Sequence, residues 1–292
     1  MLLGSVEANG LLVELIRAGI EDVSSQVVGS GAPFYYSWSP DGTRMLMQRD
    51  GARMDVYDVL EAGISDELSQ TPGSFFAPAW SPVDDRLLIG VRGEDGESTD
   101  LVIVANGETQ TLVEGLSGIA YFMWSPDGNR IAYMDVLNRN RIGTLMVVDA
   151  VTGETVARST SNSVLAFFWS PNSDQIAYVT AATASPGSFS AKVQSAPVLQ
   201  PSGGLAWSVL DVDGGAVRSY GSFVPTEQMA YLLIYFDQFA QSHRVWSPDS
   251  RHLVYSEVTA DREAMISLID TTQETSVPLF IAEGVVGIWS FN

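Results

Sequence analysis

Trp124-Ser125-Pro126-Asp127-Gly128 is the stretch that decides the fold, because other parts of the chain repeat its opening Trp-Ser-Pro. The repeats lie at 38–42, 80–82, 169–171 and 246–249, and a Trp-Ser pair recurs at 289–290. Successive tryptophans of this set are 42, 44, 45, 77 and 43 residues apart. A period in the low forties with turn residues inside it is typical of a radial array of small β-sheets.

Each repeat predicts two strands around a tight turn. In the quoted repeat an aromatic run at 121–123 precedes the tryptophan, and Ile131-Ala132-Tyr133 follows the turn. Three consecutive apolar side chains indicate a strand buried on both faces. In the turn, proline presets φ, aspartate bonds its own backbone and glycine takes the left-handed site. A further pair of strand-like runs, such as 101–104 and 109–112 around an Asn-Gly turn, adds a hairpin to each unit.

Four strands in each of six units predict an all-β fold, a six-bladed β-propeller with four antiparallel strands per blade. The expected blades cover residues 34–75, 76–119, 120–164, 165–223, 242–284, and 285–292 together with 1–33. The last blade takes its first strand from the C-terminus and the other three from 2–6, 11–16 and 23–28, which removes two open edges. The alternative is an incomplete array with a loose N-terminal segment.

These residues resemble the TolB-type propeller repeat, in which an aromatic-x-Trp-Ser-Pro-Asp-Gly turn leads into an Ile-Ala-Tyr-like strand. Residues 122–133 match that pattern, and the resemblance covers nearly the whole chain except 184–204 and 224–241. It implies a periplasmic binding protein, a gating domain of a peptidase or a sugar-acid lyase. Val83-Asp84 and Asn172-Ser173 stand where the repeat has Asp-Gly, and Ser250 replaces the glycine. We expect these departures to loosen individual turns.

Composition excludes several classes of partner and site. The 35 acidic residues outnumber the 15 basic ones, and a net charge of −20 repels nucleic acid and anionic lipid. No apolar run reaches the length of a membrane-spanning helix, so no membrane insertion is expected. The chain has no cysteine and two histidines, and it contains no nucleophile elbow, phosphate loop or dinucleotide motif. We therefore expect no catalytic residue, no metal site and no cofactor.

The gap of 77 residues between Trp169 and Trp246 is the main irregularity. A seventh blade marked by Trp207 is disfavoured, because no Pro-containing turn follows that residue. The extra length divides instead into insertions at 184–204 and 224–241, which flank one ordinary hairpin. Both insertions are expected on the same face of the propeller, where they would build up a rim.

The second insertion predicts a short helix ahead of the fifth blade, capped by Thr226. An apolar face recurs at helical spacing, and Tyr231 and Tyr235 lie beside it; the face comprises Met229, Leu232, Leu233, Phe236 and Phe239. One interpretation is that this face packs onto the propeller. The other is an exposed aromatic patch for a partner or ligand.

The sequence favours a non-catalytic, extracytoplasmic and monomeric propeller that binds a protein or peptide through the face carrying both insertions. The candidate contact residues are Tyr231, Tyr235, Asp237, Gln238, His243, Arg244, Tyr35 and Tyr121. His243 is placed on an inner strand, where it either touches a ligand or anchors the inserted helix. The alternatives are a sugar-acid or polysaccharide enzyme and a substrate-gating propeller of a larger hydrolase.

Overall fold

The computed structural model describes residues 2–7, 10–18, 23–136, 141–182, 204–240 and 242–290. The chain divides into two compact units. The first comprises Met1–Trp124, Gly128–Val136 and Ala150–Glu154, and the second comprises Ser125–Asp127, Leu137–Asp149 and Thr155–Asn292. Each unit is by itself an array of antiparallel sheets.

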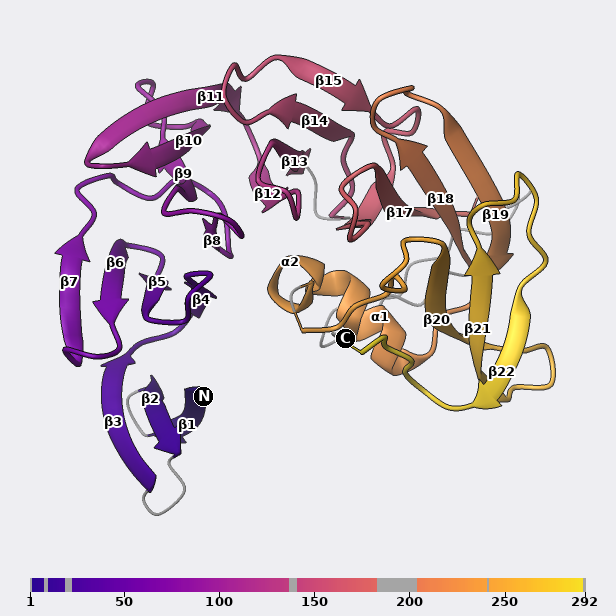
Figure 1. Ribbon diagram of the computed structural model, residues 1–292, viewed down its shortest axis with the longest axis horizontal. Helices are drawn as coiled ribbons and strands as arrows, with labels where there is room; N and C mark the ends of the chain where they lie inside the picture. Colours follow the sequence, from indigo (N-terminus) through magenta and orange to yellow (C-terminus); the bar gives the residue numbers. More distant parts are fainter. Residues whose placement is uncertain are drawn as a thin grey trace. The chain divides into compact units, whose positions relative to one another are not determined.

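The first unit contains three sheets and a hairpin (Figure 1). Its N-terminal sheet has the order β1-β2-β3, with strands Leu2–Glu7, Gly10–Ala18 and Val23–Ser30. The second sheet contains β4 (Phe34–Trp38), β5 (Arg44–Arg49), β6 (Arg53–Asp58) and β7 (Gly63–Glu67). The third contains β8 (Ala79–Trp80), β9 (Leu87–Arg92), β10 (Thr99–Ala105) and β11 (Glu108–Leu116), and the hairpin is β12 (Ile119–Trp124) with β13 (Arg130–Val136).

The second unit contains a hairpin, two sheets and two short helices. The hairpin joins β14 (Leu145–Asp149) to β15 (Thr155–Arg158). One sheet is β16 (Val164–Trp169), β17 (Gln175–Ala181), β18 (Leu205–Asp211) and β19 (Val217–Phe223), and the other is β20 (His252–Val258), β21 (Ala264–Asp270) and β22 (Leu279–Glu283). The helices α1 (Glu227–Ile234) and α2 (Phe236–Phe239) lie between β19 and β20 in the chain. Trp207 is therefore part of β18 in an ordinary sheet, as predicted, and marks no additional one.

The repeated turn depends on its serine as well as on the residues singled out from the sequence. In the second sheet the hydroxyl of Ser39 donates to the carboxylate of Asp41 (2.6 Å) and accepts from the backbone N–H of Arg44 (2.9 Å). The Ser39 hydroxyl is the largest cause that lowers the pKa of Asp41 to about 2. Gly42 takes the left-handed conformation, with φ of 70°. Ser170 and Ser247 make the same pair of bonds in their turns, so the serine closes the turn from inside, a role that sequence reasoning missed.

Two of the departures from the repeat tie neighbouring turns together. Ser173 and Ser250 stand in the place of glycine and still adopt φ of 66° and 60°. The hydroxyl of Ser173 accepts from the backbone N–H of Asp127 (3.0 Å), and that of Ser250 accepts from Asn172 (3.1 Å). Each side chain supplies a hydrogen bond that glycine cannot make, and the expectation that these substitutions loosen the turns stays a prediction.

The tryptophan of one repeat bonds to the backbone of the preceding one. The indole N–H of Trp124 donates to the carbonyl of Ala79, the residue before Trp80 (3.3 Å). In the second unit the indole N–H of Trp246 donates to the carbonyl of Phe168, the residue before Trp169 (3.0 Å). The same atom pair therefore joins neighbouring repeats once in each unit. The indole N–H of Trp80 instead donates to the carbonyl of Asp84 in its own turn (3.1 Å), and that of Trp169 is buried without a hydrogen-bond partner.

An arginine at the start of a second strand covers the next tryptophan in the first unit. The Arg44 guanidinium lies 5.0 Å from the ring centroid of Trp80, and that of Arg86 lies 4.7 Å from Trp124. Arg86 also donates to the carbonyl of Gly128 (2.7 Å). Such cation–π contacts stabilise by about 0.5–1 kcal/mol at exposed sites. The polar residue that recurs six positions after the tryptophan is thus an inter-sheet contact at these two repeats.

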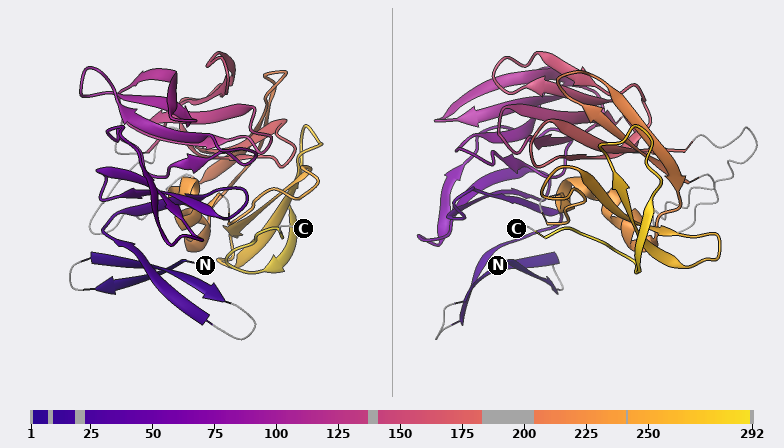
Figure 2. Two further views of the ribbon diagram at one scale, coloured as in Figure 1. Left: turned by 60° about the vertical axis from the view of Figure 1, so that its left-hand side comes forward. Right: turned by 45° about the vertical axis from the view of Figure 1, so that its right-hand side comes forward.

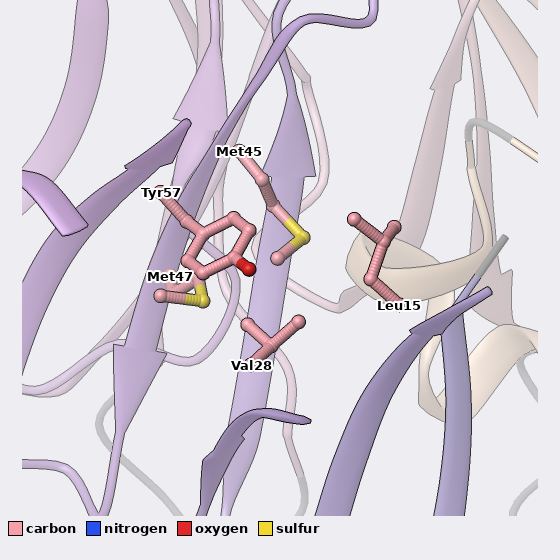
Figure 3. Close-up of a cluster of buried hydrophobic side chains, with 5 residues drawn as sticks. All are labelled: Leu15, Val28, Met45, Met47 and Tyr57. Atoms are coloured by element: carbon pink, nitrogen blue, oxygen red, sulfur yellow. The ribbon is translucent and has the colours of Figure 1, made fainter. Parts of the chain in front are cut away.

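The N-terminal strands belong to the packed core of the first unit. Leu15 and Val28 of the first sheet point toward Met45, Met47 and Tyr57 of the second, and all five are buried (Figure 3). The side-chain amide of Gln26 also donates to the carbonyl of Ala62 (2.9 Å). The two views of Figure 2 show β1–β3, in indigo, as one twisted sheet. The N-terminal strands therefore pack on the second sheet.

We predict that Trp246→Phe lowers the free energy of unfolding by about 1–3 kcal/mol more than Trp207→Phe. Trp246 is 2% exposed and bonds to Phe168, whereas Trp207 is 0% exposed and its indole nitrogen is buried without a hydrogen-bond partner. Both variants lose the same volume, so urea denaturation followed by circular dichroism isolates the hydrogen bond. Equal losses in the two variants would show that the tryptophan acts only through packing.

Candidate functional site

The helical insertion interrupts the inner edge of the β20–β22 sheet. Before the helices, Val224 accepts from Val258 (2.7 Å) and Thr226 donates to Ser256 (3.3 Å) through backbone atoms. After them, Val245 accepts from Val254 (2.8 Å). Both sides of the insertion thus pair with β20. The helices lie between β19 and β20 in the chain, as predicted, and residues on both sides of them pair with β20.

Thr226 fixes the start of α1. Its hydroxyl accepts from the backbone N–H of Met229 (3.2 Å), which confirms the predicted cap. The same hydroxyl donates to the carbonyl of Val285 (2.6 Å), and the side chain is buried. Glu227 occupies the first turn, where its negative charge interacts favourably with the helix dipole and stabilises the helix. The cap therefore ties the helix both to its own first turn and to the segment after β22.

One face of the helices packs into the second unit. Met229, Leu232, Leu233 and Phe236 are buried, as the first interpretation predicted. The Phe236 ring lies 4.9 Å from that of Phe167 and 6.1 Å from that of Phe168, both on β16. Figure 1 shows α1 beside β20 as well. The helices are consequently held on their inner side by the two neighbouring sheets of this unit.

The opposite side carries a row of rings that we call the aromatic stripe: Tyr231, Tyr235, Phe239 and His243. Ring centroids are 4.8 Å apart for Tyr231 and Tyr235, 5.8 Å for Tyr231 and Phe239, and 5.1 Å for Phe239 and His243. Tyr231 is 56% exposed and the other three are half-buried. Phe239 was predicted on the buried face, but it is half-buried and its ring contacts those of Tyr231 and His243.

Arg141 contributes a cation to the aromatic stripe from a different part of the second unit. Its guanidinium lies 5.5 Å from the ring centroid of Tyr235. The residue has φ of 57°, a left-handed conformation that is costly for a side chain with a Cβ atom. Backbone strain of this kind clusters at functional sites. No pattern in the sequence connects Arg141 to the helix, so sequence reasoning missed it.

The remaining candidates near the helix differ in exposure. Gln238 is exposed, while Asp237 and Arg244 are half-buried. His243 lies in a bend rather than on an inner strand, and its Nδ1 is 2.9 Å from the hydroxyl of Ser242. The carbonyl of Arg244 accepts from the backbone N–H of Trp289 (2.9 Å). The structure thus brings Tyr231, Tyr235 and His243 together. The ring of Phe239 lies between Tyr231 and His243 and contacts both.

Tyr35 and Tyr121 belong to the first unit, where Phe76 lies between them. The centroid of Phe76 is 5.7 Å from each of the two tyrosine rings. Tyr35 is half-buried on β4, whereas Tyr121 on β12 is buried. Tyr35 on β4, Phe76 in the bend before β8 and Tyr121 on β12 thus form an aromatic row across three successive repeats.

Other expectations concern the surroundings of the site. The insertion predicted at 184–204 lies outside the described residues except for Gly204. In the described part of the chain, no helix is long and apolar enough to cross a membrane. Among the same residues, no three His, Cys, Asp or Glu side chains gather closely enough to hold a metal ion.

Comparison with solved structures decides the fold. A β-propeller domain of Cps50 (Swd1) from Myceliophteria thermophila superposes with a TM-score of 0.52 at 11% identity, over 97% of this chain and 84% of that one. The fold is that of a β-propeller. An oligogalacturonate lyase in complex with manganese gives a TM-score of 0.62 at 12% identity, over 97% of this chain and 73% of that one. Identities this low show the fold of the propeller and nothing of its activity.

TolB from Acinetobacter baumannii also matches, at 14% identity and a TM-score of 0.47, over 94% of this chain. The chain spans only 61% of the length of that protein. No protein-family model matches the sequence. No curated protein matches it either.

We predict that Thr226→Val lowers the free energy of unfolding by about 1–2 kcal/mol, because valine keeps the shape of threonine but loses the cap. The bond to the carbonyl of Val285 is lost as well. Thr226→Ser keeps the hydroxyl and serves as the matched control, with stability close to wild type. Urea denaturation measures both variants. If serine destabilises as much as valine, the methyl group rather than the hydroxyl holds the helix.

Proposed function

We propose that this protein is a non-catalytic, monomeric β-propeller that binds a protein or peptide through the aromatic stripe on its inserted helices. The observation that carries the proposal is the separation of the two helix faces. The inner face is buried against β16 and β20, while Tyr231 on the outer side is 56% exposed. An extracytoplasmic location belongs to the same proposal, and a chain without cysteine is compatible with it.

The aromatic stripe has the composition of a binding surface. Tyrosine and phenylalanine are enriched in protein interfaces, where a few aromatic anchors carry most of the binding energy. The rings contact one another, and the capped, buried helix holds them in place. A surface that is ordered before binding loses little conformational entropy when a partner arrives. Arg141 adds a cation and hydrogen-bond donors beside Tyr235.

We predict that the double variant Tyr231→Ala/Tyr235→Ala loses peptide binding without loss of stability. The probe is a phage-displayed random-peptide library selected on immobilised wild-type protein. Peptides enriched on wild type should bind the double variant at least about tenfold more weakly, since central aromatic anchors each contribute about 2 kcal/mol or more. The melting temperature should stay within a few degrees of wild type, because the buried face of the helix is untouched.

Tyr36→Ala is the matched control, since Tyr36 is 47% exposed and belongs to the first unit. It should leave binding unchanged. Enrichment that is equally strong on wild type and on the double variant would contradict the proposal. A parallel loss of binding and melting temperature in the double variant would show that the tyrosines stabilise the fold instead.

The binding proposal includes a ring of six blades in which the chain ends complete the last sheet. Among the described residues, β1 pairs with β2 alone, and its sheet has three strands where a full blade has four. Apolar side chains stay exposed along the C-terminal part of the second unit: Val277 (90%), Leu279, Phe280, Ile281, Val285, Val286 and Ile288. Exposed apolar surface of this kind supports the proposal that the segment after β21 meets a further surface.

A further inference from the structure

The last strand of the second unit, β22, has an open edge. In the sheet order β20-β21-β22 it pairs with β21, and the described residues place no further strand beside it. Alternate backbone N–H and C=O groups of a strand point toward each of its two neighbours. The groups of β22 that point away from β21 therefore form a row that can pair with another extended chain. The proposed ring completes the sheet of β1 and adds no strand to β22.

The side chains of β22 differ from those of the other outermost strands. All six of these strands pair irregularly with their neighbours, which discourages further pairing. In the described part of the chain, β3, β7 and β15 each expose one large apolar side chain, and β11 and β19 expose none. β22 exposes three in succession: Leu279 (60%), Phe280 (55%) and Ile281 (52%). The polar side chains that shield the other edges are therefore missing along most of this one.

The edge of β22 selects the shape of what can bind there. Consecutive side chains of a strand point to opposite faces of its sheet, so Leu279 and Phe280 expose apolar surface on both faces. A strand added beside β22 can pair its own apolar side chains with these across the ladder. A helix has already used its backbone groups and cannot pair with the edge. The geometry therefore requires an extended segment.

Charge selects among extended segments. The backbone N–H of Gly284 donates to the carbonyl of Ala264 (2.9 Å), which brings Glu283 at the end of β22 close to the turn before β21. Residues 261–263 of that turn are exposed and carry two carboxylates and one guanidinium, and Glu283 is exposed as well. A basic residue of a partner is favoured at this end. A second copy of the chain is disfavoured, because each copy carries a net charge of −20.

We propose that β22 binds an extended, apolar segment of a partner protein as an added antiparallel strand, with an arginine or lysine at the N-terminal end of that segment. The antiparallel ladder is the more stable of the two arrangements. Because β22 ends at Glu283, the N-terminal residue of an antiparallel strand lies opposite this carboxylate. The surface is distinct from the aromatic stripe, since α1 packs beside β20, at the other side of the same sheet. The inference therefore goes beyond the proposed function.

The test uses a synthetic, fluorescently labelled peptide in which an arginine and a lysine precede five alternating valines and threonines. Two further versions carry N-methyl groups on alternate residues, one on the odd positions and the other on the even positions. Each version thus loses the N–H donors along one side of the strand only. Fluorescence anisotropy with the full chain should show binding of the parent peptide and of one methylated version. The other version should bind at least about tenfold more weakly, because it has lost several hydrogen bonds to β22.

Phe280→Lys should weaken the parent peptide about tenfold or more, because it places a repelling charge on the edge and removes apolar surface. Ile64→Lys is the matched control, since Ile64 is 43% exposed on the outermost strand β7, and it should leave binding unchanged. Both variants should keep the melting temperature of wild type within a few degrees, because both side chains are exposed. Glu283→Gln should weaken binding about two- to fivefold, the effect of one exposed ion pair.

Three results would each overturn the inference: no binding of the parent peptide, equal binding of the two methylated versions, or equal effects of Phe280→Lys and Ile64→Lys. Self-association in the analytical ultracentrifuge that Phe280→Lys abolishes would identify a second copy as the occupant and would overturn it too. The double variant Tyr231→Ala/Tyr235→Ala should bind the parent peptide as wild type does. The phage selection tests the aromatic stripe separately, so failure at β22 leaves that function standing.

Discussion

The strongest constraint between neighbouring repeats is a hydrogen bond, seen once in each unit, from a tryptophan indole to the backbone carbonyl that precedes the tryptophan of the repeat before it. This bond gives a partner to the indole N–H and to a backbone carbonyl at the same time. Around it, arginines cover tryptophan rings in the first unit and serine hydroxyls join successive turns in the second. The residues that recur in the sequence therefore contact residues of a neighbouring repeat.

Much of the fold could be predicted from the sequence because the Trp-Ser-Pro turns and the apolar strands around them recur at a regular spacing. The strands after each turn, the hairpin that contains Trp207 and the three N-terminal strands all follow from local patterns of apolar residues and turns. The roles of the serines could not be predicted in the same way. Ser250 looks like a defect in a turn when it is considered alone, and its hydroxyl becomes useful only when Asn172 of the preceding repeat is beside it. Local patterns cannot show a bond between residues this far apart.

In the candidate site, too, local features could be predicted from the sequence and long-range contacts could not. The cap at Thr226 and the buried face of the helix are local properties of the segment, and both were predicted. The assignment of Phe239 failed because a short helix with apolar residues on several sides does not show which side meets the protein. That choice is made by Phe167 and Phe168 on β16, which accept Phe236. Arg141 reaches Tyr235 from the connection before β14, and nothing in the spacing of the sequence relates the two. The pairing of Val224 and Val245 with β20 is likewise a long-range contact that local sequence patterns do not show.

We assign the function to the insertion and not to the repeats because the recurring side chains of the repeats contact one another. Within the repeats, tryptophans, arginines and turn serines contact one another, so the chemistry that recurs is used in holding sheets together. The helices are joined to that framework through one face and through the hydroxyl of Thr226, and their other face is not required for either contact. A residue that can change without loss of the fold can be selected for binding. The stripe of rings meets this condition, because its members lie on a rigid support while Tyr231 stays exposed to solvent.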